Sequence, residues 1–204
     1  YVMELVGTFF LTVAVTLTGN PIAIGLMLVG LMYVGAHVSG GHYNPAVSLA
    51  ACLREKININ EMLWYMAVQV AGALLGMWLF ALITNNVYEP DVAPGITVWV
   101  AVLMEGLLAM LYCLVWLTVL TTQRFKSTML YGFATGLTLL AIVSVGGLFN
   151  PAIAFATMIC TMGKATGMFA SGDNLIIYIV GPLVGGAIAV SLIRYLNAKE
   201  KKSA

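Results

Sequence analysis

The chain has 204 residues, of which 61% are hydrophobic and only 8% are charged, and its formal net charge is +1. A typical soluble domain has roughly 45–50% apolar and about 25% charged residues, so this composition excludes a soluble globular protein and predicts a membrane protein. A charge so close to zero gives no reason to expect a nucleic-acid partner. The cysteines Cys52, Cys113 and Cys160 lie in apolar stretches, and we expect no disulfide, metal or cofactor.

The first two apolar segments, 2–18 and 21–39, are predicted to be transmembrane helices. A helix needs about 20 residues to cross the hydrocarbon core, and the first segment is shorter because the chain begins inside it. Since Tyr1 already belongs to an apolar run, we expect further residues to precede it.

A turn with two glycines leads next into Asn44-Pro45-Ala46, which opens the short apolar stretch 45–53. Asn is a favoured N-cap, and Pro is well tolerated at the first helical position, so the motif predicts a helix start. A helix of this length reaches about 13 Å, less than half of a core of about 30 Å. We therefore predict a half-length helix that ends inside the membrane.

The rest of the chain repeats this order of segments. A third span completes the first half, and after a loop come two spans, a glycine pair, a second Asn-Pro-Ala, a second short helix and a last span. The predicted spans are 62–84, 97–121, 128–146 and 175–196, and the second half-length helix is 151–162, behind Asn150, Pro151 and Ala152.

Each half thus contains three spans, and because three is odd, the second half lies upside down relative to the first. We predict one all-α membrane domain over 1–204, built from inverted repeats at 1–84 and 97–196 that are joined by the loop 85–96. The two half-length helices would meet near the midplane. Non-helical backbone at that depth is tolerated only where it is buried in protein or lines a wet cavity, so the doubled motif predicts a pore.

Basic residues predict the orientation, because Lys and Arg concentrate on the cytoplasmic side of a membrane protein. All but one of the nine basic residues follow or close an even-numbered span, which predicts cytoplasmic termini and an extracellular loop 85–96. They are Arg54, Lys56, Arg124, Lys126, Arg194, Lys199, Lys201 and Lys202; the exception is Lys164, and Glu89, Asp91 and Asp173 lie on the other side.

The two motifs also predict the chemistry at their meeting point. Each helix N-terminus carries about half an elementary positive charge, so two N-termini facing one spot repel cations. The side-chain oxygens of Asn44 and Asn150 are expected to cap the backbone, which leaves amide N–H donors for a neutral solute with oxygen lone pairs.

Over essentially its whole length, the sequence resembles the aquaporin and aquaglyceroporin (major intrinsic protein) family. The stretch HVSGGHYNPAVSLA is similar to the family's first pore loop, VQVAGALLG to its third helix and VGPLVGGAIAV to its sixth. The resemblance implies six transmembrane helices and two half-helices, a homotetramer in the lipid bilayer, and passive passage of water or small uncharged solutes such as glycerol, ammonia or hydrogen peroxide.

The resemblance also implies roles for four buried polar residues. Glu4 and Glu105 match the glutamates that hold the pore loops through backbone N–H groups, in agreement with the rule that intramembrane carboxylates face the protein interior. We interpret His42 as a structural residue beside the first loop, and Gln69 as an interhelical hydrogen-bonding residue.

The sequence departs from the family at the outer constriction. Family members usually carry Arg directly after the second Asn-Pro-Ala, where this chain has Ile153. Counting back from the two Asn residues without gaps puts the other constriction positions at Ile24, Thr138 and Gly147. A different alignment of the fifth span puts Leu139 in place of Thr138. Either ring has no charge and at most one hydroxyl.

This apolar ring is compatible with two opposite effects on solute flow. Loss of the Arg removes a cation and a strong donor, so solutes larger or less polar than water pass more freely, but a hydrophobic ring can also stay dry and block flow. We predict a passive channel, with a non-conducting structural or assembly subunit of the same fold as the alternative. A secondary transporter is disfavoured because only Glu4 and Glu105 are available as intramembrane carboxylates, and an enzyme is disfavoured further.

Overall fold

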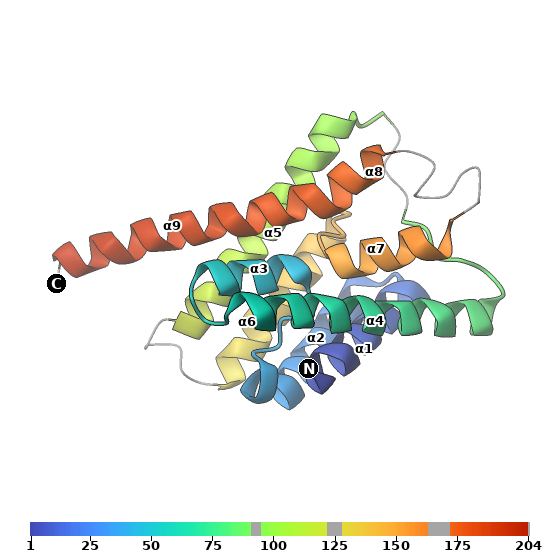
Figure 1. Ribbon diagram of the computed structural model, residues 1–204, viewed down its shortest axis with the longest axis horizontal. Coiled ribbons are helices and arrows are strands. Elements are labelled where there is room, and N and C mark those ends of the chain that lie inside the picture. The colour runs from blue at the N-terminus through green and yellow to red at the C-terminus, as the bar shows by residue number, and fades with distance from the viewer. Residues whose placement is uncertain (91–94, 122–127, 163–171, 204) are drawn as a thin grey trace.

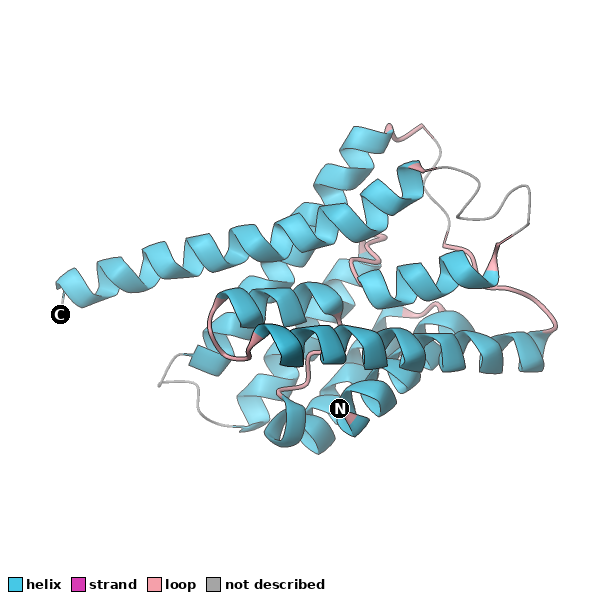
Figure 2. Ribbon diagram, in the orientation of Figure 1, coloured by secondary structure: helices cyan, strands magenta, loops and turns pink. Residues whose placement is uncertain are grey.

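The computed structural model describes residues 1–90, 95–121, 128–162 and 172–203. Every regular element within these ranges is a helix, and none is a strand (Figures 1 and 2). They are α1 (Val2–Thr18), α2 (Pro21–Ser39), α3 (Pro45–Leu53), α4 (Ile59–Thr84), α5 (Val98–Thr121), α6 (Thr128–Ser144), α7 (Pro151–Cys160), α8 (Asp173–Leu175), the π-helix η2 (Ile176–Val180) and α9 (Gly181–Ser203).

The predicted architecture of six spans and two half-length helices is confirmed. Four spans are long and apolar enough to cross a membrane: α2, α4, α5, and α8, η2 and α9 taken together, which follow one another without a break. The other two, α1 and α6, have 17 residues each and reach about 26 Å. The half-length helices α3 and α7 have 9 and 10 residues.

Three helices begin with the same local signal, an Asn followed by Pro. The side-chain oxygens of Asn20, Asn44 and Asn150 each accept a hydrogen bond from the backbone N–H two residues later, and Pro occupies the first helical position. At the other end of α2, Gly40 adopts a φ of 87°, a left-handed conformation that favours glycine and turns the chain toward α3.

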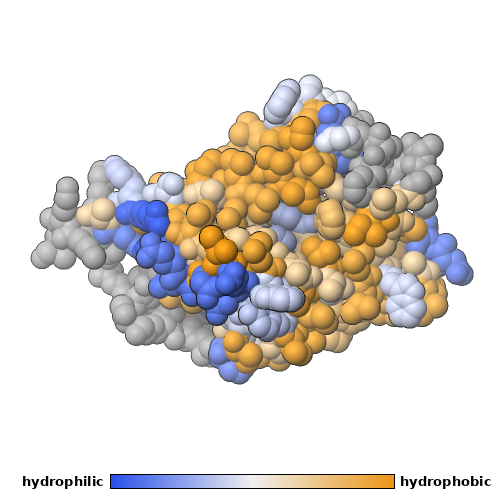
Figure 3. Space-filling view, in the orientation of Figure 1, coloured by the Kyte–Doolittle hydropathy of each residue, from blue (hydrophilic) through white to orange (hydrophobic). Residues whose placement is uncertain are grey.

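The two half-length helices start near the centre of the molecule and run in opposite directions (Figure 1). We call the end that holds the C-terminal end of α4, the C-terminal end of α7 and α8 the outer half. The end that holds the α3–α4 connection and the C-terminal end of α9 is the inner half. Hydrophobic side chains dominate the surface between the two ends (Figure 3), as expected for a protein in lipid.

Equivalent helices of the two halves make equivalent contacts: α1 packs against α4, α5 packs against α9, and α2 packs against α6. Glycines permit these close approaches. A Cβ atom on Gly72 would overlap the backbone of Leu5, and one on Gly185 would overlap the backbone of Gly106. The paired contacts agree with an inverted repeat.

A basic residue of α9 lies at the C-terminal end of α3. Arg194 of α9 donates to the carbonyl oxygen of Leu53 at 2.6 Å and lies 4.0 Å from the carboxylate of Glu55, so a cation sits at the C-terminus of α3, where the helix dipole favours it. Asp91, Arg124, Lys126 and Lys164 lie outside the described residues, as do the side chains of Lys199, Lys201 and Lys202.

Candidate pore and constriction

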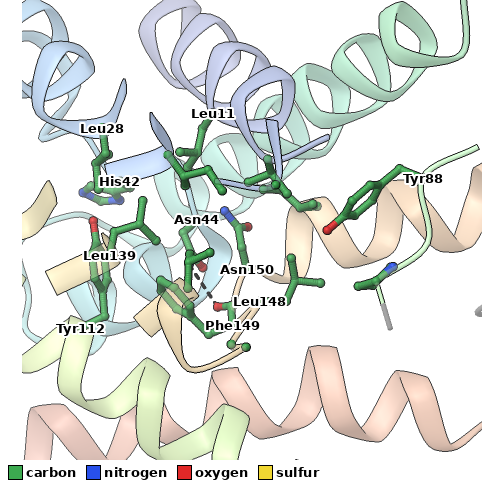
Figure 4. A pocket seen from close by; sticks show the side chains of 18 residues that line it. Leu11, Leu28, His42, Asn44, Tyr88, Tyr112, Leu139, Leu148, Phe149 and Asn150 are labelled. Atoms are coloured by element: carbon green, nitrogen blue, oxygen red, sulfur yellow. Dashed lines mark hydrogen bonds between the residues drawn. The ribbon is translucent and has the colours of Figure 1, made fainter. Parts of the chain in front are cut away.

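The two Asn-Pro-Ala loops contact each other at the centre of the molecule. The side-chain amide of Asn44 donates to the carbonyl oxygen of Phe149 at 3.1 Å (Figure 4). That of Asn150 donates to the carbonyl oxygen of Tyr43 at 2.9 Å. The expected contact between the loops is therefore present. The sequence did not indicate that each Asn would use one donor to hold the opposite loop.

Each Asn still has a donor left. The side-chain oxygens of Asn44 and Asn150 accept from Ala46 N at 2.8 Å and from Ala152 N at 3.1 Å, which satisfies the start of each half-length helix. A primary amide has two N–H groups. One holds the other loop, and the second is available to the cavity that both Asn residues line.

The carboxylate of Glu4 accepts four hydrogen bonds, two of them from backbone N–H groups of the first loop. One oxygen accepts from the Ser39 hydroxyl at 2.6 Å and from His42 N at 2.9 Å, and the other accepts from Tyr43 N at 2.7 Å and from the Gln69 amide at 2.8 Å. Ser39 was missed by sequence reasoning, although its place at the end of α2 is the signal that could have found it.

The carboxylate of Glu105 holds the second loop with fewer partners. Its two oxygens accept from the backbone N–H groups of Leu148 and Phe149. Among the described residues, no side chain donates to the Glu105 carboxylate. The two glutamates, which hold matching positions in the two halves, therefore differ in the number of hydrogen bonds that they accept.

His42 and Gln69 meet at the hydroxyl of Ser48, a residue of α3 that sequence reasoning missed. The Gln69 amide donates to this hydroxyl at 3.0 Å, and Nδ1 of His42 also lies 3.0 Å from it. The His42 ring packs at right angles against Trp116, with ring centroids 4.8 Å apart. The positions agree with the structural roles expected for both residues.

A cavity of about 200 Å³ extends from the two loops into the outer half (Figure 4). Helices α1, α2, α5 and α6, the α4–α5 connection and the second loop all contribute to its wall. The lining residues are Leu11, Val15, Gly19, Ile24, Leu28, His42, Asn44, Tyr88, Pro90, Tyr112, Leu139, Val143, Gly146, Gly147, Leu148, Phe149, Asn150 and Ile153.

Three of the predicted constriction residues line this cavity, and the fourth does not. Ile24, Gly147 and Ile153 belong to the wall, whereas Thr138 does not, and its hydroxyl donates to the carbonyl oxygen of Ala134 within α6 at 2.7 Å. From α6, Leu139 and Val143 line the cavity. The cavity wall therefore favours the alternative, Leu139, over Thr138, because adjacent residues on a helix point about 100° apart. Which residues form the constriction stays a prediction.

Apolar residues make up much of this wall. Ile24, Leu139 and Ile153 are almost completely buried, and Gly147 contributes only backbone. Tyr88 and Pro90 from the α4–α5 connection also line the cavity, and Tyr88 reaches into it in Figure 4. No sequence signal pointed to these two residues.

Comparison with known proteins identifies the family to which the chain belongs. The model of the family described as major intrinsic protein matches residues 1–193. The chain belongs to the major intrinsic protein family. A solved structure of the aquaglyceroporin from Plasmodium falciparum matches with a TM-score of 0.82 and 22% identity, covering 100% of this chain and 98% of that one. The two proteins share their fold.

Relatives in the major intrinsic protein family carry different names. The chain is 33% identical to the probable aquaporin TIP3-2 of Arabidopsis thaliana, over 86% of this chain and 66% of the plant protein. It is 28% identical to the glycerol uptake facilitator protein-like 6 of Lactiplantibacillus plantarum, over 98% and 99% of the two chains. Human aquaporin-4 is 29% identical, but the alignment spans only 55% of its length. Family membership therefore leaves the solute to be argued from this chain's own residues.

Proposed function

We propose that this protein is a passive channel for water and small uncharged solutes, with an outer constriction that lacks the arginine usual in its family. The observation that carries this proposal is the meeting of two half-length helices at Asn44 and Asn150, at one end of the cavity. Backbone ends at membrane depth are tolerated where they are buried in protein or line a cavity, and both Asn residues line one here.

Electrostatics supports the restriction to uncharged solutes. The N-termini of α3 and α7 each carry about half a positive charge, and they act on the same point of the cavity. Among the described residues that line the cavity there is no Asp, Glu, Lys or Arg to attract or neutralise an ion. A cation would lose its hydration there and find only repulsion.

The chemistry of the cavity wall suits a solute that has both hydroxyl and carbon groups. The spare amide N–H groups of Asn44 and Asn150 suit oxygen lone pairs, and Ile24, Leu139 and Ile153 suit apolar carbons. A ring without charge opposes wetting, so water gains less from it than glycerol does. We therefore expect glycerol to pass relatively easily compared with water.

The proposal includes an orientation and an assembly. Arg54 and Lys56 follow α3 and Arg194 lies in α9, so these basic residues belong to the inner half, which we assign to the cytoplasm. A homotetramer, typical of the family, would give each subunit its own pore.

Permeability of reconstituted vesicles tests the proposal. Purified protein in liposomes should raise the rates of water and glycerol entry above those of protein-free liposomes, and Leu139→Trp should abolish the increase by filling the cavity. Leu137→Trp is the matched control, because Leu137 lies on the same helix but is 53% exposed. If no solute passes faster than through lipid, the non-conducting structural subunit is the better description.

A further inference from the structure

The cavity occupies only one half of the solute path. Val15 and Ile24 of its wall lie toward the outer ends of α1 and α2, and Leu11 and Leu28 lie near the middle of these helices. It ends at the two loops, where His42 and Tyr112 lie beside each other in the wall (Figure 4). A solute that crosses the membrane must also pass the inner half.

The inverted repeat identifies which residues face the inner half of the path. A Cβ atom on Gly25 would lie 2.7 Å from the carbonyl oxygen of Gly136, and one on Gly132 would lie 3.4 Å from that of Val29. If Gly25 corresponds to Gly132 and Val29 to Gly136, the inverted repeat converts each of these two contacts into the other. The residue before each first glycine then corresponds as well, so Tyr131 is the inner counterpart of Ile24.

The loop-holding glutamates provide the same correspondence for α1 and α5. Leu11 and Val15 lie two and three helical turns after Glu4, and the residues at the same distances after Glu105 are Tyr112 and Trp116. The inner half thus has three aromatic residues, Tyr112, Trp116 and Tyr131, where the outer half has three aliphatic residues. We call these three the inner aromatic cluster.

The inner aromatic cluster is buried against both pore loops: Trp116 and Tyr131 contact the first loop, and the Tyr112 ring lies 5.1 Å from that of Phe149 in the second. Trp116, Tyr112 and Tyr131 are 0%, 2% and 8% exposed. The rings of Trp116 and Tyr131 lie 6.5 Å apart, and Trp116 packs on His42. The Tyr131 hydroxyl donates to the carbonyl oxygen of Gly40 at 2.9 Å, which joins α6 to the start of the loop.

The corresponding part of the outer half is open. Gly146, the counterpart of Gly40, lines the cavity with the three residues that follow it. The two halves therefore share a backbone plan but differ in side-chain volume, since each aromatic ring fills far more space than Leu, Val or Ile at the same place.

We propose that the inner aromatic cluster is a second constriction, and that it sets the permeability of this protein more than the apolar outer ring does. The inference rests on the proposed channel function and adds the residues that limit it. The Tyr131–Gly40 hydrogen bond fixes one ring of the cluster beside the first loop. The two tyrosine hydroxyls offer hydrogen bonds to a small polar solute that squeezes past, while larger solutes meet the rings.

Substitutions that reduce the size or the hydrogen bonding of the inner aromatic cluster test the second constriction. Tyr112→Leu installs the residue of its counterpart, and Tyr131→Phe removes only the hydroxyl that bonds Gly40. In liposomes, we expect Tyr112→Leu to raise water and glycerol permeability roughly tenfold, as when a barrier falls by about 1.4 kcal/mol. Tyr131→Phe should raise both about threefold, the scale of one neutral hydrogen bond. Phe133→Leu, two residues away on α6 and 44% exposed, should change neither.

The outcomes separate this inference from the function on which it rests. If the unsubstituted protein conducts and neither Tyr112→Leu nor Tyr131→Phe conducts faster, the inner constriction is wrong and the channel stands. If Tyr112→Leu does not fold, Tyr131→Phe, which keeps the ring, decides the question alone. If no variant passes water or glycerol faster than protein-free lipid, the channel function itself is wrong.

Discussion

Gln69 donates its side-chain amide to Glu4 at 2.8 Å, and the same nitrogen lies 3.0 Å from the Ser48 hydroxyl. One residue of α4 therefore connects α1 to the half-length helix α3. The carboxylate of Glu4 is fully buried, and its four donors replace the hydration that it loses. The first loop is accordingly held by a network of side chains from four helices, α1 to α4.

This network predicts that Glu4→Gln is more damaging to stability than Glu105→Gln. Glutamine replaces one accepting oxygen by an NH₂ group, which would face the donors of Tyr43 or Gln69. Leaving a buried donor unsatisfied costs about 1–3 kcal/mol. Glu105 has two donors rather than four, so fewer are affected.

Thermal unfolding of the purified variants in detergent measures this difference. The midpoint should fall most for Glu4→Gln, less for Glu105→Gln, and hardly at all for the exposed control Glu55→Gln. The fraction of Glu4→Gln that folds should keep its preference among solutes. Normal stability together with an altered preference would contradict the loop-holding role.

Asn44→Ala is predicted to destabilise the protein more than Asn20→Ala. Both substitutions remove an N-cap before Pro, at a cost of about 0.5–2 kcal/mol. Only Asn44 also donates to the opposite loop, at Phe149, and that buried hydrogen bond adds about 1 kcal/mol. Equal losses of stability for the two variants would show that the contact between the loops contributes nothing.

Gly185→Ala and Gly30→Ala are predicted to act in opposite directions. A methyl group on Gly185 would overlap the backbone of Gly106 and force α9 away from α5, whereas at Gly30 no other atom lies within 4 Å of the added carbon. Alanine is favoured over glycine inside a helix by roughly 0.5–1 kcal/mol, so Gly30→Ala should raise the unfolding midpoint. The opposite ranking would mean that α5 and α9 do not pack through these glycines.

The boundaries of the helices could be predicted because their signals are local. The predicted stretch 45–53 is α3 as observed, since Asn44 and Pro45 determine its start by capping and by a fixed φ angle. The second half-length helix ends at Cys160, two residues before the predicted end, and the nearest glycine in the sequence, Gly163, follows the predicted end and not the observed one.

The constriction could be predicted only in part, because it depends on contacts between distant segments. Ile153 and Gly147 are close to Asn150 in the sequence, and both line the cavity as counting from Asn150 predicts. The choice between Thr138 and Leu139 depends on how α6 rotates against α2, where Gly136 meets Gly25. Tyr88 enters the wall from a connection whose path no periodicity describes.

The position after the second Asn-Pro-Ala gives the prediction most specific to this chain. Ile153 is buried in the first turn of α7 and lines the cavity with Ile24 and Leu139. Ile153→Arg would add five donors and a permanent charge to a ring that has neither. Water would gain hydrogen-bond partners, while the opening for a glycerol-sized solute would shrink. The ratio of water to glycerol permeability in liposomes should therefore rise.

The charge makes the folding of Ile153→Arg a test in its own right. An uncompensated Arg at the centre of a membrane helix costs about 2.5–3.5 kcal/mol, and the positive N-terminus of α7 adds to that cost. The variant should fold only if water reaches the ring, because hydration of the guanidinium then offsets the penalty. Ile153→Leu, which keeps the ring apolar, should retain the original ratio. A well-folded Ile153→Arg whose water-to-glycerol ratio equals that of Ile153→Leu would show that this position does not limit the solute path.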